Sequence, residues 1–139
     1  MRPRVAVFGE ASKGAYHVPH CPRDLLELEA LLGHPPRGSL GIEFAVQTIL
    51  FERDLIFFRV EEEGFSEPDY YAGLRLLIRT LPLRQGLAAL SLPGVGDGEI
   101  LEAAAPLTEQ ERALLIMSER DLYDYLTTHE APSQESGSS

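Results

Sequence analysis

The sequence has one cysteine and one lysine, and it lacks any apolar run of the roughly 20 residues that span a bilayer. Cys21 alone forms no internal disulfide, which is typical of a reducing compartment. Residues 1–4 lead directly into a strand-like run instead of the apolar core of a signal peptide. We therefore expect a soluble, cytoplasmic protein that does not enter a membrane.

Positive charge is also scarce, with 12 lysine and arginine residues against 22 carboxylates and a formal net charge of -10. Nucleic-acid binding depends on clustered basic residues that neutralise phosphates, so DNA and RNA are not expected partners. The charge is uneven, because ten carboxylates but only Arg112 and Arg120 follow residue 96. Any anionic ligand is expected in the N-terminal half of the chain.

The length of 139 residues suits a single domain, which we predict over residues 1–130. Apolar runs at 4–8, 55–60, 87–92 and 114–117 predict four strands, although the last run also fits the continuation of a helix. Helical spacing predicts helices over 22–33, 39–53, 66–81 and 98–105 and from Glu119 onward. Ser39, Ser66 and Ser118 are expected to cap three of them, and Pro106 to stop one. Residues 131–139 have nothing to bury and are expected to be a disordered tail.

Strands that alternate with helices predict an α/β fold, specifically a Rossmann-like three-layer sandwich with a mainly parallel sheet of about four strands. Ligands of such sheets bind outside the carboxyl ends of the strands. Three segments of the sequence fall at or near that edge, namely residues 7–14, 38–41 and 92–99. They are therefore the candidate ligand loops.

The third loop places three glycines between a strand and a helix. Glycine lets the backbone approach a ligand closely, and the amides at a helix N-terminus suit a phosphate. Asp97 opposes a phosphate, because a carboxylate cap would occupy those amides; a sugar hydroxyl is then its expected partner. Residues 38–41 also place glycines before a helix N-terminus whose amides suit a phosphate, and Ser39 adds a hydroxyl donor. Each segment also has an equally good explanation without a ligand. Residues 92–99 fit a tight strand-to-helix turn, and residues 38–41 fit the start of a helix capped by Ser39.

His17, His20 and Cys21 are residue types that bind zinc, but a structural zinc site needs four ligands and the other two histidines lie in unrelated settings. We therefore predict no metal site. A Cys21 nucleophile assisted by one of these histidines is an alternative, but plain loop structure is the interpretation that we prefer. Residues 61–63 are all glutamate and are predicted to form a solvated turn.

In their order along the chain, the three loops resemble motifs of the LOG-type, or lysine-decarboxylase-like, phosphoribohydrolases of the Rossmann-like superfamily. Residues 7–16 are similar to that family's first strand and V-F-C-G-S-S-x-G loop, and residues 38–42 to its G-G-x-x-G-L-M-G segment. Residues 92–99 are similar to its P-G-G-x-G-T-x-E-E motif, with one glycine lost and Asp97 in place of threonine. Glu43 replaces a methionine, and the family's M-H-x-R-K motif is missing.

The resemblance implies a homodimer. We predict that the chain binds a nucleotide or a related phosphorylated ligand at the carboxyl edge of the sheet and uses no cofactor. The family's hydrolysis of the N-glycosidic bond of a nucleoside 5′-monophosphate is either retained or lost. Glu99 matches the family's catalytic glutamate, which would stabilise a ribosyl cation. Of the arginines before the third strand (Arg75, Arg79 and Arg84), Arg79 is our candidate to replace the arginine of the missing motif. The candidate ligand-binding residues are Gly9, Glu10, Ser12, Lys13, Gly38, Ser39, Gly41, Gly94, Gly96, Asp97 and Gly98. A catalytically inactive interaction or sensor protein is the alternative function.

Overall fold

The structure is a computed structural model that describes residues 2–80 and 86–128. Its four parallel strands lie in the order β2-β1-β3-β4 and comprise Arg4–Gly9 (β1), Asp54–Arg59 (β2), Ala89–Ser91 (β3) and Leu114–Ile116 (β4). The helices of the described part are Leu25–Leu32 (α1), Gly41–Leu50 (α2), Glu67–Thr80 (α3), Gly98–Glu111 (α4) and Glu119–Thr128 (α5). The predicted Rossmann-like α/β fold with a four-stranded parallel sheet is confirmed, and residues 114–117 contribute a strand.

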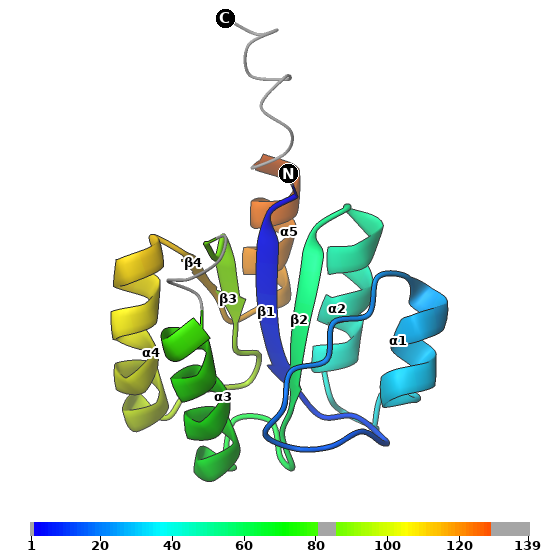
Figure 1. The fold of residues 1–139 in the computed structure, drawn as a ribbon, viewed down its shortest axis with the longest axis horizontal. Coiled ribbons are helices and arrows are strands. Elements are labelled where there is room, and N and C mark those ends of the chain that lie inside the picture. Colours follow the sequence, from blue (N-terminus) through cyan, green and yellow to red (C-terminus); the bar gives the residue numbers. More distant parts are fainter. Residues whose placement is uncertain (1, 81–85, 129–139) are drawn as a thin grey trace, which may run out of the picture.

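Helices cover both faces of the sheet, with α3 and α4 on one side and α1, α2 and α5 on the other (Figure 1). The central strand β1 has alternating residues that pack into the two layers, so Val5 and Val7 face one side while Ala6 and Phe8 face the other. The ring of Phe8 stacks on those of Phe58 and Tyr70, with centroids 4.9 and 5.6 Å apart. The core therefore consists of two apolar layers separated by the sheet.

The outer edge of β2 is covered by the segment that follows β1. His20 and Phe57 exchange backbone hydrogen bonds of 2.9 and 2.7 Å in an antiparallel bridge, and Tyr16 pairs with Arg59. An uncovered strand edge would be a template for aggregation, and this pairing protects it. The same pairing carries residues 21–23 toward the beginning of β2.

The prediction that Pro106 stops a helix is wrong, because α4 continues through this proline to Glu111. The extra residues bury Leu107, which is 1% exposed, against the α3–α4 side of the core. The helix ends where Arg112 takes a left-handed conformation with φ 55°. Burial of Leu107 outweighs the backbone hydrogen bond that proline cannot donate.

Ser66 and Ser118, two of the three serines predicted to cap helices, are each followed by an aspartate three residues later, but they behave differently. The hydroxyl of Ser118 accepts a hydrogen bond from the Asp121 N–H at 3.1 Å, as predicted for the start of α5. The hydroxyl of Ser66 instead bonds the backbone of Glu62, at 3.1 Å to both its N–H and its carbonyl oxygen. The Ser66 hydroxyl therefore closes the turn before α3, and it is the Ser66 carbonyl oxygen that accepts from the N–H groups of Asp69 and Tyr70.

Two sequence predictions fall outside the described residues: the tail over 131–139 and the structural context of Arg84. Within residues 2–80 and 86–128, no helix combines the length and the apolar character needed to cross a membrane.

Replacing Pro106 with alanine should stabilise the protein. Alanine restores the N–H that the helix interior lacks and relieves the clash of the proline ring, so we expect Pro106→Ala to raise the free energy of unfolding by about 1–3 kcal/mol. Urea denaturation measures the change. Gln110→Ala, on an exposed position of the same helix, is the control and should stay within about 0.5 kcal/mol of wild type. A clear loss of stability in Pro106→Ala would contradict this account of α4.

Candidate functional site

The three candidate loops converge at the carboxyl edge of the sheet, which is the lower edge in Figure 1. The first two are in backbone contact, because a Cβ added to Gly9 would lie 2.5 Å from the Cα of Gly41. A fourth loop, residues 60–66 after β2, reaches the third. A Cβ added to Gly64, where φ is +90°, would collide with the carbonyl group of Gly94. Glycine at these positions makes room for a neighbouring backbone.

The carboxylate of Glu63 joins the fourth loop to the first two. Its Oε1 accepts a hydrogen bond from the Leu40 N–H at 2.9 Å, and its Oε2 accepts from the N–H groups of Gly41 and Glu10, both at 2.8 Å. The Glu63 N–H donates in return to the carboxylate of Glu10 at 2.9 Å. Glu63 therefore caps the N-terminus of α2 from a distant loop, where the helix dipole favours a negative charge.

Two expectations about this region are wrong. Ser39 does not cap α2, because the N-cap residue is Leu40 and the Ser39 hydroxyl donates to the carbonyl oxygen of Pro36 at 2.6 Å. The turn at 61–63 is not wholly solvated, because Glu63 is half-buried while Glu61 and Glu62 are exposed. Glu63 follows Gly41 by 22 residues, so local spacing gave no signal for the contact.

The fourth loop is anchored in the core through Tyr70. The phenolic oxygen of Tyr70 accepts a hydrogen bond from the Gly64 N–H at 2.7 Å. Burial raises the pKa of Tyr70, and the negative charges of Glu63, Glu10 and Asp69 raise it further. The hydroxyl therefore stays neutral and serves as a fixed attachment point for the loop.

In the first loop, Ser12 forms hydrogen bonds with other parts of the chain. The Ser12 hydroxyl donates to the Leu32 carbonyl oxygen at 3.2 Å and accepts from the His34 N–H at 2.9 Å, at the C-terminal end of α1. Lys13 is exposed. Arg59, at the end of β2, donates to the Gly14 carbonyl oxygen at 2.6 Å. The sequence did not indicate a role for Arg59 at this edge, because its position is that of an ordinary last residue of a strand.

The third loop is acidic. Asp97 caps α4 by accepting a hydrogen bond from the Glu99 N–H at 2.7 Å, which is the arrangement that opposes a phosphate on these amides. A side-chain hydrogen bond between Glu67 and Asp97 raises the pKa of Glu67 and lowers the pKa of Asp97. Glu99 is exposed in the first turn of α4 and adds a third carboxylate.

Arg79 does not lie beside Glu99. Glu99 is in the first turn of α4, at the carboxyl edge of the sheet, whereas Arg79 is in the last turn of α3. Arg79 follows Glu67 by 12 residues, which corresponds to about 18 Å along the helix. The structure thus separates the two residues proposed for catalysis.

Three candidate glycines face open space. Gly38, Gly96 and Gly98 are exposed, and no heavy atom lies within 4 Å of a Cβ added to any of them. The backbone of Gly38 has a φ of +80°, a conformation that favours glycine. At Gly96 and Gly98, by contrast, no neighbouring atom would collide with a side chain. These positions stay accessible to a ligand or partner.

His17, His20 and Cys21, which are close in sequence, have different surroundings in the structure. His17 Nε2 lies 2.6 Å from a carboxylate oxygen of Asp69, and His20 Nε2 lies 2.9 Å from the Ala15 carbonyl oxygen. Within the described residues, no group of three or more His, Cys, Asp or Glu side chains is arranged to hold a metal ion. Cys21 is exposed and lies elsewhere, at the edge where the strands begin.

Comparison of the chain with known protein families, with curated protein sequences and with solved structures found no match. What the structure establishes is therefore the Rossmann-like α/β fold, and no family is identified.

Removing the charge of Glu63 should destabilise the protein. Glutamine keeps the shape but offers one acceptor oxygen to three N–H groups, so we expect Glu63→Gln to lower the free energy of unfolding by about 2–4 kcal/mol. Glu62→Gln, on an exposed neighbour whose carboxylate makes none of these bonds, should change it by less than about 0.5 kcal/mol. Urea denaturation at pH 7 compares the two variants. Equal stability would show that the bonds of Glu63 contribute little.

Proposed function

We propose that this chain is a non-catalytic interaction or sensor protein, and that its carboxyl edge does not hydrolyse nucleotides. The observation that carries the proposal is the Glu63 carboxylate on the amides of Glu10, Leu40 and Gly41. A phosphate at the N-terminus of α2 would need those donors and would meet the negative charges of Glu63 and Glu10. An internal carboxylate thus occupies the place where the fold would otherwise hold an anion.

The third loop supports the same proposal. Hydrolysis of an N-glycosidic bond by this chain would need a cation to hold the phosphate or ribose near Glu99. The neighbours of Glu99 include the carboxylates of Glu67 and Asp97, and Arg79 lies at the opposite end of α3. This arrangement favours binding of an uncharged group over cleavage of a nucleotide.

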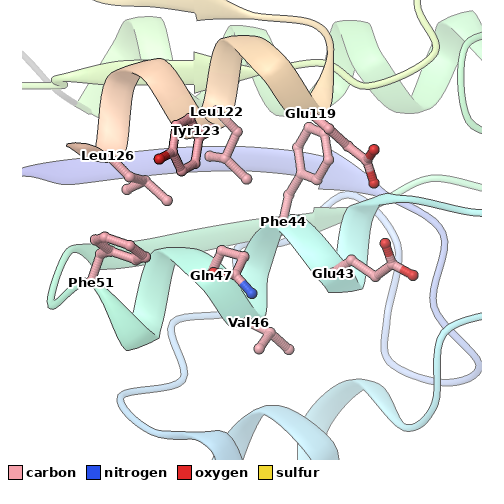
Figure 2. Close-up of a pocket in the computed structure, with 9 residues that line it drawn as sticks. All are labelled: Glu43, Phe44, Val46, Gln47, Phe51, Glu119, Leu122, Tyr123 and Leu126. Carbon is pink, nitrogen blue, oxygen red and sulfur yellow. The ribbon is translucent and has the colours of Figure 1, made fainter. Parts of the chain in front are cut away.

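The partner that we propose is a second copy of the chain, bound to the face formed by α2 and α5. A groove of about 440 Å³ lies between these helices. Figure 2 shows Phe44 of α2 and Leu122 and Leu126 of α5 pointing into it, with Phe51 at one end. Helix α2 carries a single charged residue, Glu43, and a helix that is apolar around most of its surface is usually covered.

The residues around this groove suit a symmetric contact. Leu50 is 56% exposed and Tyr123 is 65% exposed, and both are large apolar side chains that a partner would shield from water. The homodimer implied by the family resemblance agrees with this contact.

Hydrolysis is tested directly by incubating the protein with adenosine, guanosine, cytidine and uridine 5′-monophosphates and measuring free base. We expect no release above the buffer blank. Glu99→Gln should cost only about 0.3–1 kcal/mol of stability, through loss of a favourable charge at the start of α4. Release of base by wild type, slowed on the order of 100-fold in Glu99→Gln, would overturn the non-catalytic proposal.

The dimer is tested by multi-angle light scattering. Tyr123→Glu places a charge on the proposed contact, so we expect the variant to be monomeric at concentrations where wild type is dimeric. Phe65→Glu is the control, because Phe65 is equally exposed but belongs to the loop after β2. A monomeric wild type, or a Tyr123→Glu variant that still dimerises, would refute the α2–α5 contact.

A further inference from the structure

The two outer edges of the sheet differ in how they are covered. Residues 16–20 pair with the outer edge of β2, whereas within residues 2–80 and 86–128 the strand β4 pairs with β3 alone (Figure 1). Leu114 and Leu115 of β4 are 42% and 39% exposed. An open strand edge is a template for pairing with another chain. A further strand can therefore be added at β4.

The backbone groups of β4 that face outward are those of its central residue, Leu115. The Leu114 N–H donates to the Ala88 carbonyl oxygen at 3.0 Å. The Ile116 carbonyl oxygen accepts from the Leu92 N–H at 2.8 Å. Residues 114 and 116 thus bond toward β3. Because backbone groups alternate in direction along a strand, Leu115 turns its N–H and its carbonyl oxygen to the outer side.

The same alternation makes residues 113 and 117 the next outward positions, and their N–H groups are already used. The Ala113 N–H donates to the Thr108 carbonyl oxygen at 3.0 Å, and the Met117 N–H donates to the Asp121 carboxylate at 3.0 Å. Their carbonyl oxygens accept no hydrogen bond from the described part of the chain. The edge therefore offers carbonyl oxygens at three positions but an N–H only at Leu115.

This imbalance favours a peptide segment over a second copy of β4. Two copies paired across a two-fold axis at Leu115 would exchange the two hydrogen bonds of that residue. Beyond it, carbonyl groups of one copy would oppose carbonyl groups of the other. An extended peptide has an N–H at every residue except proline, so it supplies the donors that the edge lacks.

The charge near β4 indicates the kind of segment. The residues that flank the strand in sequence carry more negative than positive charge, with Glu109, Glu111, Glu119 and Asp121 against Arg112 and Arg120. The whole chain has a net charge of -10. Charge complementarity therefore favours a basic segment.

We propose that the outer edge of β4 binds an extended peptide segment of a partner protein in which lysine or arginine alternates with apolar residues. Main-chain hydrogen bonds give affinity in complexes of this kind, and side chains at alternate positions give specificity. Leu114 and Leu115 lie opposite Ala89 and Leu90, so they face opposite sides of the sheet, and an apolar side chain of the segment covers one of them. The proposal concerns a different surface from the α2–α5 contact and does not rest on it.

The probe is the heptapeptide Lys-Val-Lys-Val-Lys-Val-Lys with blocked ends, and the measurement is amide hydrogen exchange of wild type followed by NMR. In the free protein the Leu115 amide should exchange much faster than the Leu114 amide, which is bonded to β3. At ten times the Kd of the peptide, exchange at Leu115 should slow about tenfold, because only the free fraction exchanges. Exchange at Leu114 should change little. The same peptide with glutamate in place of lysine should leave Leu115 unaffected at equal concentration.

A pair of variants tests the outward N–H itself. Leu115→Pro removes this donor, and proline is tolerated in an edge strand where its nitrogen faces solvent, so the variant should keep the circular dichroism spectrum of wild type. Leu115→Ala is the matched control, because it loses the same side chain but keeps the N–H. The Kd of the lysine peptide should be about tenfold higher for Leu115→Pro than for Leu115→Ala.

Protection of the Leu115 amide in the free protein would overturn the proposal, because a second copy or another segment of the chain would then occupy the edge. Absence of slowing by the lysine peptide, or equal slowing by the glutamate peptide, would also overturn it. These outcomes are read on wild type, so they decide even where Leu115→Pro does not fold. Tyr123→Glu alters the α2–α5 groove and should keep the slowing at Leu115, so the two proposals can fail separately.

Discussion

The arrangement of the carboxyl edge depends on one half-buried interaction, the carboxylate of Glu63 shared among three backbone N–H groups. Glu10 belongs to the first loop, Leu40 and Gly41 lie in the second loop at the start of α2, and Glu63 belongs to the fourth loop. Charge-assisted hydrogen bonds of this kind are strong because donors and acceptor are partly removed from water. The contact also requires the close approach of Gly9 and Gly41, where no side chain fits. Loop geometry, glycine usage and the cap of α2 are thus consequences of a single contact.

The same principle explains how charge is distributed over the molecule. The backbone N–H groups at the start of α1, α2 and α4 donate hydrogen bonds to carboxylates of the chain itself, those of Asp24, Glu63 and Asp97. Helix N-termini attract anions, and here internal groups satisfy that attraction. Four arginines lie instead where β1 and β2 begin, and two of them are paired there with carboxylates, Arg2 with Asp54 and Arg23 with Glu27. The fold keeps the layers of an α/β protein, while its own carboxylates occupy the N-termini of α2 and α4 at the carboxyl edge of the sheet.

Most of the fold was predictable because it follows from local patterns. The apolar runs at 4–8 and 55–60 become buried strands, and Ser118 starts α5 as its spacing with Asp121 indicates. The convergence of the three loops follows from the parallel sheet. The errors occur where a distant contact outweighs a local preference. Ser39 is a good cap by type, but Glu63 supplies the cap of α2 from another loop, and burial of Leu107 carries α4 past Pro106. The contact of Glu63 has no signal in local spacing, whereas Ile100, Ala104 and Leu107 follow the i, i+4, i+7 spacing of a helix that continues past Pro106.

A crystal structure of the protein grown with adenosine 5′-monophosphate tests the central claim most directly, because it shows which group occupies the amides at the start of α2. The account predicts that the Glu63 carboxylate remains on the N–H groups of Glu10, Leu40 and Gly41 and that no phosphate binds there. A phosphate on those three amides, with the Glu63 side chain turned away, would contradict it and would restore the carboxyl edge as a nucleotide site.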